Sequence, residues 1–236
     1  MRDVQVLATD YDGTLARHGT VEPATLRALA RWREAGRRVI LVTGRELHEL
    51  REVFPQLDSL DLVVAENGAL LYEPVTQKVE LLCPPTSREF VEELGKRGVA
   101  PLFVGRAIVA TQEPNQGAVA EVIAALKLPL EIIMNKGSVM VLPGGVNKAT
   151  GLQTALRTRG WNRVQTAAIG DGENDYDLLA AGGLAVAVSN AVPELKKRAD
   201  YVTQASHGAG VAELLDLILA EKLEVGVQAE WTPPLT

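Results

Sequence analysis

Short apolar runs alternate with amphipathic segments in the first part of the chain. The spacing of hydrophobic and polar positions predicts strands at about 4–9, 39–43 and 61–65 and helices at about 23–35 and 46–53. The run at 39–42 is continuously apolar, as in a strand that is buried on both faces. Pro23 stands in the first turn of the first helix and Gly36 follows its end. This βαβαβ order is typical of a parallel sheet covered by helices.

The same alternation returns near the end of the chain. There the pattern predicts helices at about 148–158 and 175–181 and strands at about 164–169, 184–188 and 200–203. The segment in between predicts, in order, a helix at about 87–97, strands near 102–104 and 106–111, a helix at about 115–126, and strands near 130–135 and 138–142. Lys136-Gly137 suggests a hairpin between the last two strands. From about residue 222 no period is clear, which predicts an edge strand or a loosely held end.

These elements predict an α/β protein built from two units. A Rossmann-like core with a parallel sheet is expected at residues 1–80 and 146–236. A small α+β cap with the pattern αββαββ is expected at residues 81–145, where strands adjacent in sequence and joined by tight turns predict an antiparallel sheet. The length of 236 residues suits a core with a smaller second unit.

Composition and charge narrow the class of protein. The chain is 47% hydrophobic and contains no apolar run near the roughly 18 to 20 residues that a membrane span requires. Its first residues do not resemble a signal peptide, and Cys83 is its only cysteine, so we expect a cytoplasmic protein without disulfides. With 24 basic and 30 acidic side chains the net charge is −6, which argues against nucleic acid as a partner. We expect a monomer or small homo-oligomer that binds no membrane.

Two carboxylates follow the first predicted strand, in Asp10-Tyr11-Asp12-Gly13-Thr14. In an extended chain Asp10 and Asp12 lie on the same side, so both would project from the strand end, where open α/β sheets bind their ligands. Asp-Gly is also a common turn dipeptide, and a turn explains Asp12-Gly13 equally well. A turn alone does not explain why Asp10 ends a buried strand.

Two further features suggest an anion. Thr43, Gly44 and Arg45 end the second strand and open a helix, where a hydroxyl and backbone N–H groups could hold phosphate. A capping threonine is the alternative. Lys148 lies near the start of a helix, which the helix dipole disfavours, although a solvated surface lysine would explain it as well.

A fourth feature, residues 169–175, is dense in acids and follows a late strand. An EF-hand is excluded, because Tyr176 and Gly182 stand where its glycine and glutamate belong. Right-handed crossovers place this strand beside the first strand, so Asp171 and Asp175 would face the two aspartates of the first strand end. Clustered carboxylates repel one another unless a cation bridges them, and these hard oxygen ligands predict Mg²⁺.

These four features, in this order, resemble the motifs of the haloacid dehalogenase superfamily, and of its Cof-type phosphatase branch in particular. The resemblance extends to about residue 220. The segment inserted after the second motif resembles the αββαββ cap of that branch, and Glu66-Asn67-Gly68-Ala69 matches a segment near its hinge. Glu173 departs from the pattern, because many members carry a small or neutral residue there.

The resemblance implies a Mg²⁺-dependent phosphatase that acts on a small phosphate monoester, of the phosphoglycolate or sugar phosphate type. Asp10 would be the nucleophile that forms an aspartyl-phosphate, and Asp12 the general acid and base. The implied ligands are Thr43, Gly44, Lys148 and Asn174 for phosphate, Arg45, Asn67 and Arg106 for the rest of the substrate, and Asp10, Asp12, Asp171 and Asp175 for the metal site. Within that site, Asp12 would contribute its backbone carbonyl and Asp175 would steady the other acids.

Two alternatives stay open from the sequence. A phosphotransferase or sugar phosphomutase would use the same aspartate, and the core motifs do not separate it from a phosphatase. A metal-binding regulatory module that has lost turnover would keep the same fold.

Overall fold

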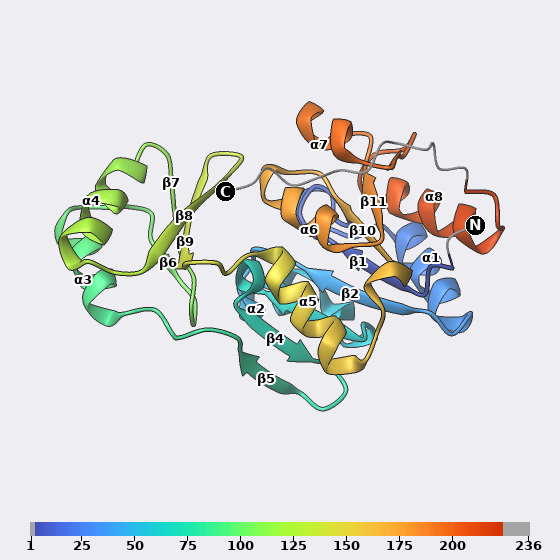
Figure 1. The fold of residues 1–236 in the computed structure, drawn as a ribbon, viewed down its shortest axis with the longest axis horizontal. Coiled ribbons are helices and arrows are strands. Elements are labelled where there is room, and N and C mark those ends of the chain that lie inside the picture. Colours follow the sequence, from blue (N-terminus) through green and yellow to red (C-terminus); the bar gives the residue numbers. More distant parts are fainter. Residues whose placement is uncertain (1–2, 224–236) are drawn as a thin grey trace.

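The computed structural model describes residues 3–223, and its larger sheet joins eight strands (Figure 1). Their order across the sheet is β12 (Tyr201–Val202), β11 (Leu184–Ala187), β10 (Thr166–Gly170), β1 (Val6–Thr9), β2 (Arg38–Val42), β3 (Leu62–Ala65), β4 (Leu70–Glu73) and β5 (Lys78–Leu81). The strands from β12 to β3 pair in parallel, and β4 and β5 are antiparallel. The predicted parallel α/β core is therefore confirmed, and β1 and β10 are neighbours as the crossover rule requires.

Helices cover both faces of this sheet. Helices α1 (Pro23–Glu34) and α8 (His207–Leu219) pack against each other on one face, and α5 (Lys148–Arg159) and α6 (Tyr176–Ala181) pack together on the other. Side chains alternate along β2, so that Val39 and Leu41 join the first layer while Ile40 and Val42 join the second. Burial on both faces explains the continuous apolar run in the sequence.

The smaller sheet has four antiparallel strands, in the order β6 (Phe103–Val104), β7 (Val109–Gln112), β9 (Ser138–Pro143) and β8 (Leu130–Asn135). Helices α3 (Arg88–Lys96) and α4 (Gln116–Leu126) cover one face, packing on Val139 and Val141 of β9. The alternate residues Met140 and Leu142 face the other way. The predicted order of helix, two strands, helix and two strands is confirmed, while the domain bounds of 81 and 145 stay a prediction.

Several elements received no assignment from the sequence. Strands β4 and β5 form a hairpin in a segment for which the sequence predicted no element, and β5 is a mostly exposed edge strand with a weak pattern. Helix α7 (Pro193–Arg198) is short, and α8 opens with glycines that obscure its apolar spacing. The predicted tail from residue 222 lies almost wholly outside the described residues. Within residues 3–223, no helix combines the length and apolar character of a membrane span.

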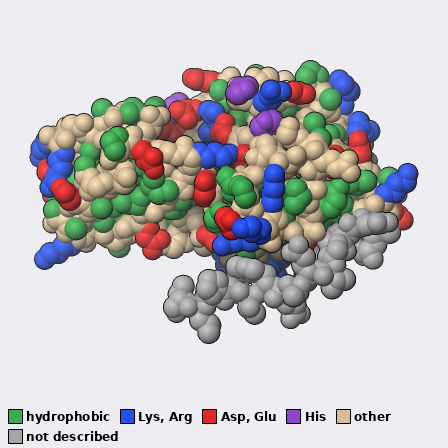
Figure 2. Space-filling model, turned by 90° about the horizontal axis from the view of Figure 1, so that it is seen from above, with side chains coloured by type: hydrophobic (Ala, Val, Ile, Leu, Met, Phe, Trp, Pro, Cys, Tyr) green, Lys and Arg blue, Asp and Glu red, His purple; other side chains and the backbone are tan. Residues whose placement is uncertain are grey.

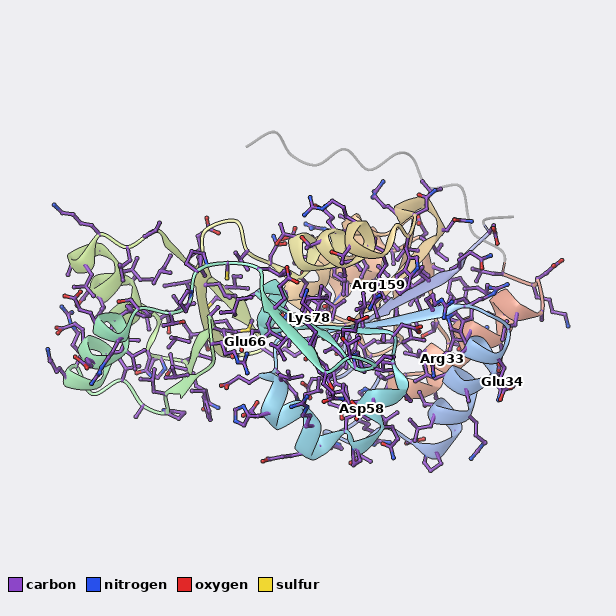
Figure 3. The ribbon with its side chains drawn as sticks, turned by 90° about the horizontal axis from the view of Figure 1, so that it is seen from below. Arg33, Glu34, Asp58, Glu66, Lys78 and Arg159 are labelled. Atoms are coloured by element: carbon purple, nitrogen blue, oxygen red, sulfur yellow. The ribbon has the colours of Figure 1, made fainter. Side chains whose placement is uncertain are left out.

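Glu66 ties the smaller sheet to the larger one. It begins the 3₁₀ turn η2 (Glu66–Gly68) after β3, is 2% exposed, and lies at the junction of the two sheets (Figure 3). Its Oε1 accepts a hydrogen bond from the backbone N of Arg106 (3.1 Å), and its Oε2 accepts from Ala107 (2.8 Å) and Ile108 (3.1 Å). A Cβ at Gly105 would lie 2.8 Å from Oε2, so only glycine admits the carboxylate there. One buried carboxylate thus anchors a loop of the smaller unit.

Gly68 holds the same turn against helix α5. Its φ is +110°, and an added Cβ would lie 1.9 Å from the carbonyl oxygen of Asn147. From the helix side, a Cβ at Gly151 would lie 2.7 Å from Cα of Gly68 and 2.5 Å from Cγ1 of Val64. The backbone of this turn therefore packs directly on the backbone of α5, the helix that follows the smaller sheet in the chain.

We expect Glu66→Ala to lower the free energy of unfolding by about 3 kcal/mol or more, because three backbone donors lose their acceptor, two of them on buried residues. The control is Glu80→Ala, since Glu80 lies on β5 and its exposed side chain pairs with exposed Lys78, and this change should stay within about 0.5 kcal/mol. Urea unfolding measures both. Equal effects of the two changes would contradict the anchoring role.

We expect Gly151→Ala to destabilise the protein by about 1 to 3 kcal/mol, because the new methyl group has no space against Gly68. Gly117→Ala is the matched control, since Gly117 also lies in a helix but its Cβ would meet no atom within 4 Å. This second change should be neutral or stabilising by up to about 1 kcal/mol. A Gly151→Ala protein as stable as the Gly117→Ala protein would disprove the close packing.

Candidate active site

The site begins where β1 and β10 end side by side. The backbone N of Asp10 donates to the carbonyl of Ile169 at 3.0 Å, which continues the pairing of the two strands. Asp10 and Asp171 therefore leave the sheet next to each other, as the sequence predicted. Both are buried, whereas the side chain of Asp12 is 47% exposed.

Three buried carboxylates converge at these strand ends. Oxygens of Asp10, Asp171 and Asp175 all lie within 4.8 Å of one another. The Nζ of Lys148, whose side chain is 1% exposed, lies 2.6 Å from Oδ1 of Asp10 and 2.7 Å from Oδ1 of Asp175. The alternative of a solvated surface lysine at 148 is therefore wrong, because the two acids hold this ammonium group inside the protein.

A helix cap aims Lys148 at the acids. Asn147 is the N-cap of α5, and its Oδ1 accepts from the backbone N of Thr150 at 3.0 Å. Thr150 Oγ1 in turn accepts from the backbone N of Asn147 at 3.1 Å, which completes a capping box. The helix therefore begins at Lys148, and its side chain points toward the ends of the neighbouring strands.

Asp175 orders the loop that carries Asp171. Its Oδ2 accepts from the backbone N of Asp171 and of Gly172, each at 2.9 Å. Thr14 Oγ1 lies 3.2 Å from Oδ1 of Asp171, and a Cβ at Gly13 would lie only 2.2 Å from Oδ2. The Asp-Gly step after β1 is thus required for close approach to Asp171, which the turn alternative does not account for.

Asp12 is paired with Arg45 across the mouth of the site. The Nε of Arg45 lies 2.6 Å from Oδ2 of Asp12, and its Nη2 lies 2.8 Å from Oδ1. The guanidinium also lies over the ring of Tyr11, 5.6 Å from its centroid. The sequence analysis predicted that Arg45 binds the substrate. In this structure its guanidinium group pairs with the carboxylate of Asp12.

A cavity of about 300 Å³ opens above the carboxylates, between the two sheets. The larger unit and the smaller unit both contribute to its wall. Its lining residues are Asp10, Asp12, Gly44, Arg45, Glu46, Glu49 and Asn174 from one side and Phe103, Ile108, Ala110, Asn135, Ser138 and Met140 from the other.

The remaining predicted ligands are Thr43, Asn174, Asn67 and Arg106. Thr43 is buried, and its Oγ1 accepts from the backbone N of Arg45 at 3.1 Å; it does not cap α2 (Leu47–Val53), whose N-cap is Glu46. Asn174 Nδ2 lies 3.2 Å from Oδ1 of Asn67, whose buried Nδ2 has no hydrogen-bond partner within the described residues. Arg106 is exposed and does not line the cavity.

Sequence reasoning missed two polar residues beside Asp171. The Nζ of Lys136, at the β8–β9 hairpin, lies 2.5 Å from Oδ2 of Asp171. The Nδ2 of Asn190 lies 3.2 Å from the same oxygen. Asn190 also donates to the carbonyl of Gly13 at 2.8 Å. Asn190 follows β11, another strand that ends at this edge of the sheet, and that position was a usable signal.

Burial controls the charge state of the site. It raises the pKa of Asp10 to about 7, against the opposing effect of the Lys148 ammonium group. Burial also raises the pKa of Asp171, with Lys136 opposing. Burial would lower the pKa of Lys148, but the charges of Asp10 and Asp175 outweigh it and hold that pKa above its usual range. The three carboxylates offer hard oxygen ligands at one point, which suits a divalent cation.

We expect the metal-free protein to lose stability as the pH rises from about 4 to about 7. The raised pKa of Asp10 means that the folded protein holds a proton that the unfolded chain releases, so stability present at low pH is lost through this window. Asp10→Asn should flatten the dependence, while Asp216→Asn, at an exposed surface pair, should retain it. Urea unfolding in chelator at several pH values is the measurement. A wild-type stability that rises over this window, with Asp10→Asn unchanged from it, would contradict the assignment.

Comparison with known proteins agrees with this arrangement. A family model described as haloacid dehalogenase-like hydrolase matches residues 7–97 and 118–215. A phosphoglycolate phosphatase of Methanothermobacter thermautotrophicus is 32% identical over 218 residues, covering 89% of this chain and 96% of that protein. A phosphoglycolate phosphatase of Metallosphaera sedula is also 32% identical, over 237 residues, covering 92% of this chain and 100% of that protein.

The fold has relatives among solved structures as well. The crystal structure of a haloacid dehalogenase-like hydrolase from Bacteroides thetaiotaomicron superposes with a TM-score of 0.75 at 20% identity, covering 91% of this chain and 99% of that chain. Both units of the present fold are thus included in the match. With its four motifs gathered at one end of the parallel sheet, the chain belongs to the family of haloacid dehalogenase-like hydrolases.

Proposed function

We propose that this protein is a Mg²⁺-dependent phosphatase that hydrolyses a small phosphate monoester through an aspartyl-phosphate on Asp10. The observation that carries the proposal is the buried contact of 2.6 Å between Lys148 and Asp10, beside two further carboxylates. Such a group of acids repels a phosphate dianion unless cations offset it. Lys148 supplies one positive charge, and the acids suit a metal ion that supplies the rest.

In this proposal the metal ligands are the carboxylates of Asp10 and Asp171 and the backbone carbonyl of Asp12. Asp175 steadies the loop of Asp171 through its two backbone hydrogen bonds. When bound, Mg²⁺ would neutralise charge on the phosphoryl oxygens and orient them. The phosphate ligands from the chain would be the Thr43 hydroxyl, Gly44 N–H, Lys148 and Asn174. Gly44 and Asn174 line the cavity, and Lys148 contacts the lining residue Asp10.

The reaction takes two steps, and Asp12 acts in both. A carboxylate oxygen of Asp10 attacks phosphorus, the bond from phosphorus to the ester oxygen breaks, and Asp12 protonates the departing alcohol. Asp12 then takes a proton from a water molecule that attacks the same phosphorus, which releases inorganic phosphate and restores Asp10. The contacts of Arg45 support this role because its two hydrogen bonds hold the Asp12 side chain on the cavity wall, beside Asp10.

The names of the two relatives favour a phosphorylated small acid as substrate, with a sugar phosphate as the alternative. A cavity of about 300 Å³ is at the small end of ligand sites and accommodates either. Transfer of the phosphoryl group to a second sugar would make the enzyme a phosphotransferase or phosphomutase. A catalytically silent module is disfavoured, because no predicted catalytic position lacks its functional group.

The test is phosphate release from a panel of phosphate monoesters by purified protein. We expect turnover with Mg²⁺, its loss in chelator, and a drop of at least about 10³-fold in Asp10→Asn, which keeps the size of the side chain. Asp216→Asn should behave like the wild type. In ¹⁸O-labelled water the product phosphate should carry label. Label-free phosphate on a second sugar would favour the transferase, and a folded, metal-binding protein without turnover on any ester would contradict the proposal.

A further inference from the structure

Lys136 brings a positive charge from the smaller sheet into the carboxylate site. It stands in the turn between β8 and β9, and its Nζ lies 2.5 Å from Oδ2 of Asp171. The lysine side chain is 44% exposed and the aspartate side chain 3%, so the ammonium group reaches the acid from the solvent side. Figure 2 shows acidic and basic side chains together where the two lobes meet.

The hairpin that carries Lys136 is well defined. Lys136 and Gly137 have φ of 48° and 81°, the pair of positive values that a two-residue type I′ turn requires. The β8–β9 pairing continues to Asn135 and Ser138, the residues that flank the turn. Both flanking residues line the cavity. The turn therefore delivers the lysine to the edge of the substrate space at a fixed position.

The charged side chains that line the cavity are mostly acidic. Asp12, Glu46 and Glu49 line its wall, and Arg45 is held by both oxygens of Asp12. A substrate with a second negative group would be repelled at this mouth unless another cation met it. Lys136 is that cation, since its present partner Asp171 is the residue proposed to bind the metal. A divalent ion on Asp171 would take up the carboxylate and free the ammonium group for the substrate.

We propose that Lys136 determines specificity by binding the carboxylate of a phosphorylated small carboxylic acid. This inference rests on the proposed phosphatase function and selects the acid over the neutral sugar phosphate. With the phosphoryl group held by Thr43 and Lys148 of the core, as proposed above, its substituent would extend across the cavity toward Asn135 and Ser138 of the cap hairpin. A short acid places its carboxylate within reach of an ammonium group on a four-carbon side chain.

The test compares two esters of nearly equal size, 2-phosphoglycolate and 2-hydroxyethyl phosphate, which differ in the carboxylate. In Lys136→Met the ratio of kcat/KM for the acid to kcat/KM for the neutral ester should fall about 10-fold to 100-fold, mainly through KM, because one charge-assisted hydrogen bond is lost. Lys136→Arg should recover much of the ratio. The matched control is Lys127→Met, since Lys127 is also an exposed cap lysine with positive φ, at the C-cap of α4; its ratio should equal that of the wild type.

Binding without turnover gives an independent measurement. Calorimetric titration of Asp10→Asn and of Asp10→Asn/Lys136→Met with both esters should show the same selective loss for the acid. Equal losses for the two esters, in rate or in affinity, would overturn the proposal, because they would mean that Lys136 contacts the phosphoryl group or only closes the cap. A wild type that turns over neutral esters but does not prefer the acid would overturn it as well. No turnover of any ester would refute the proposed function itself.

Discussion

The ion pairs of one buried lysine organise this molecule. Lys148 reaches from the first residue of α5 to one aspartate at the end of β1 and another in the loop after β10, and all three side chains are buried. Removing one member of such a group would leave uncompensated charge in the interior. The parallel order of the sheet, the cap of α5 and the loop after β10 can therefore be understood as the means of bringing these charges together.

The same charges explain why so many residues near the site lack a side chain or use the backbone. Gly13 lets Asp171 approach β1, and Gly170 would clash with Asp175 if it carried a Cβ, 2.6 Å from its carboxylate carbon. Carboxylates need several donors when they are buried, and here backbone N–H groups provide them to Asp175. Local conformations with little tolerance for substitution follow from the requirement to hold acids close to one another.

The sequence predicted most of the fold, because the parallel strands are continuous apolar runs and their helices start and end at clear signals. It predicted that Asp10, Asp171 and Asp175 meet, because strand ends and crossover handedness determine which loops are neighbours, whereas the place of Lys148 in the site followed only from the family resemblance. It did not predict the engagement of Arg45 by Asp12 or the approach of Lys136, since both depend on how a side chain turns or how the smaller sheet docks. Neither the orientation of a side chain nor the docking of one sheet on another produces a periodic pattern in the sequence. Strand β5 and helix α7 were missed because an edge strand and a short helix bury few side chains.

The turn at Glu66–Gly68 gives the two units a shared support. At one end it holds the loop before β7 through a carboxylate, and at the other it abuts the peptide of Asn147, which caps the helix of Lys148. An excised core would keep a buried acid without its donors and would have to rebuild the start of α5 across a new junction. The two units therefore depend on the same turn for their packing, and exchanging the smaller unit for another cap would require a matching change in these three residues.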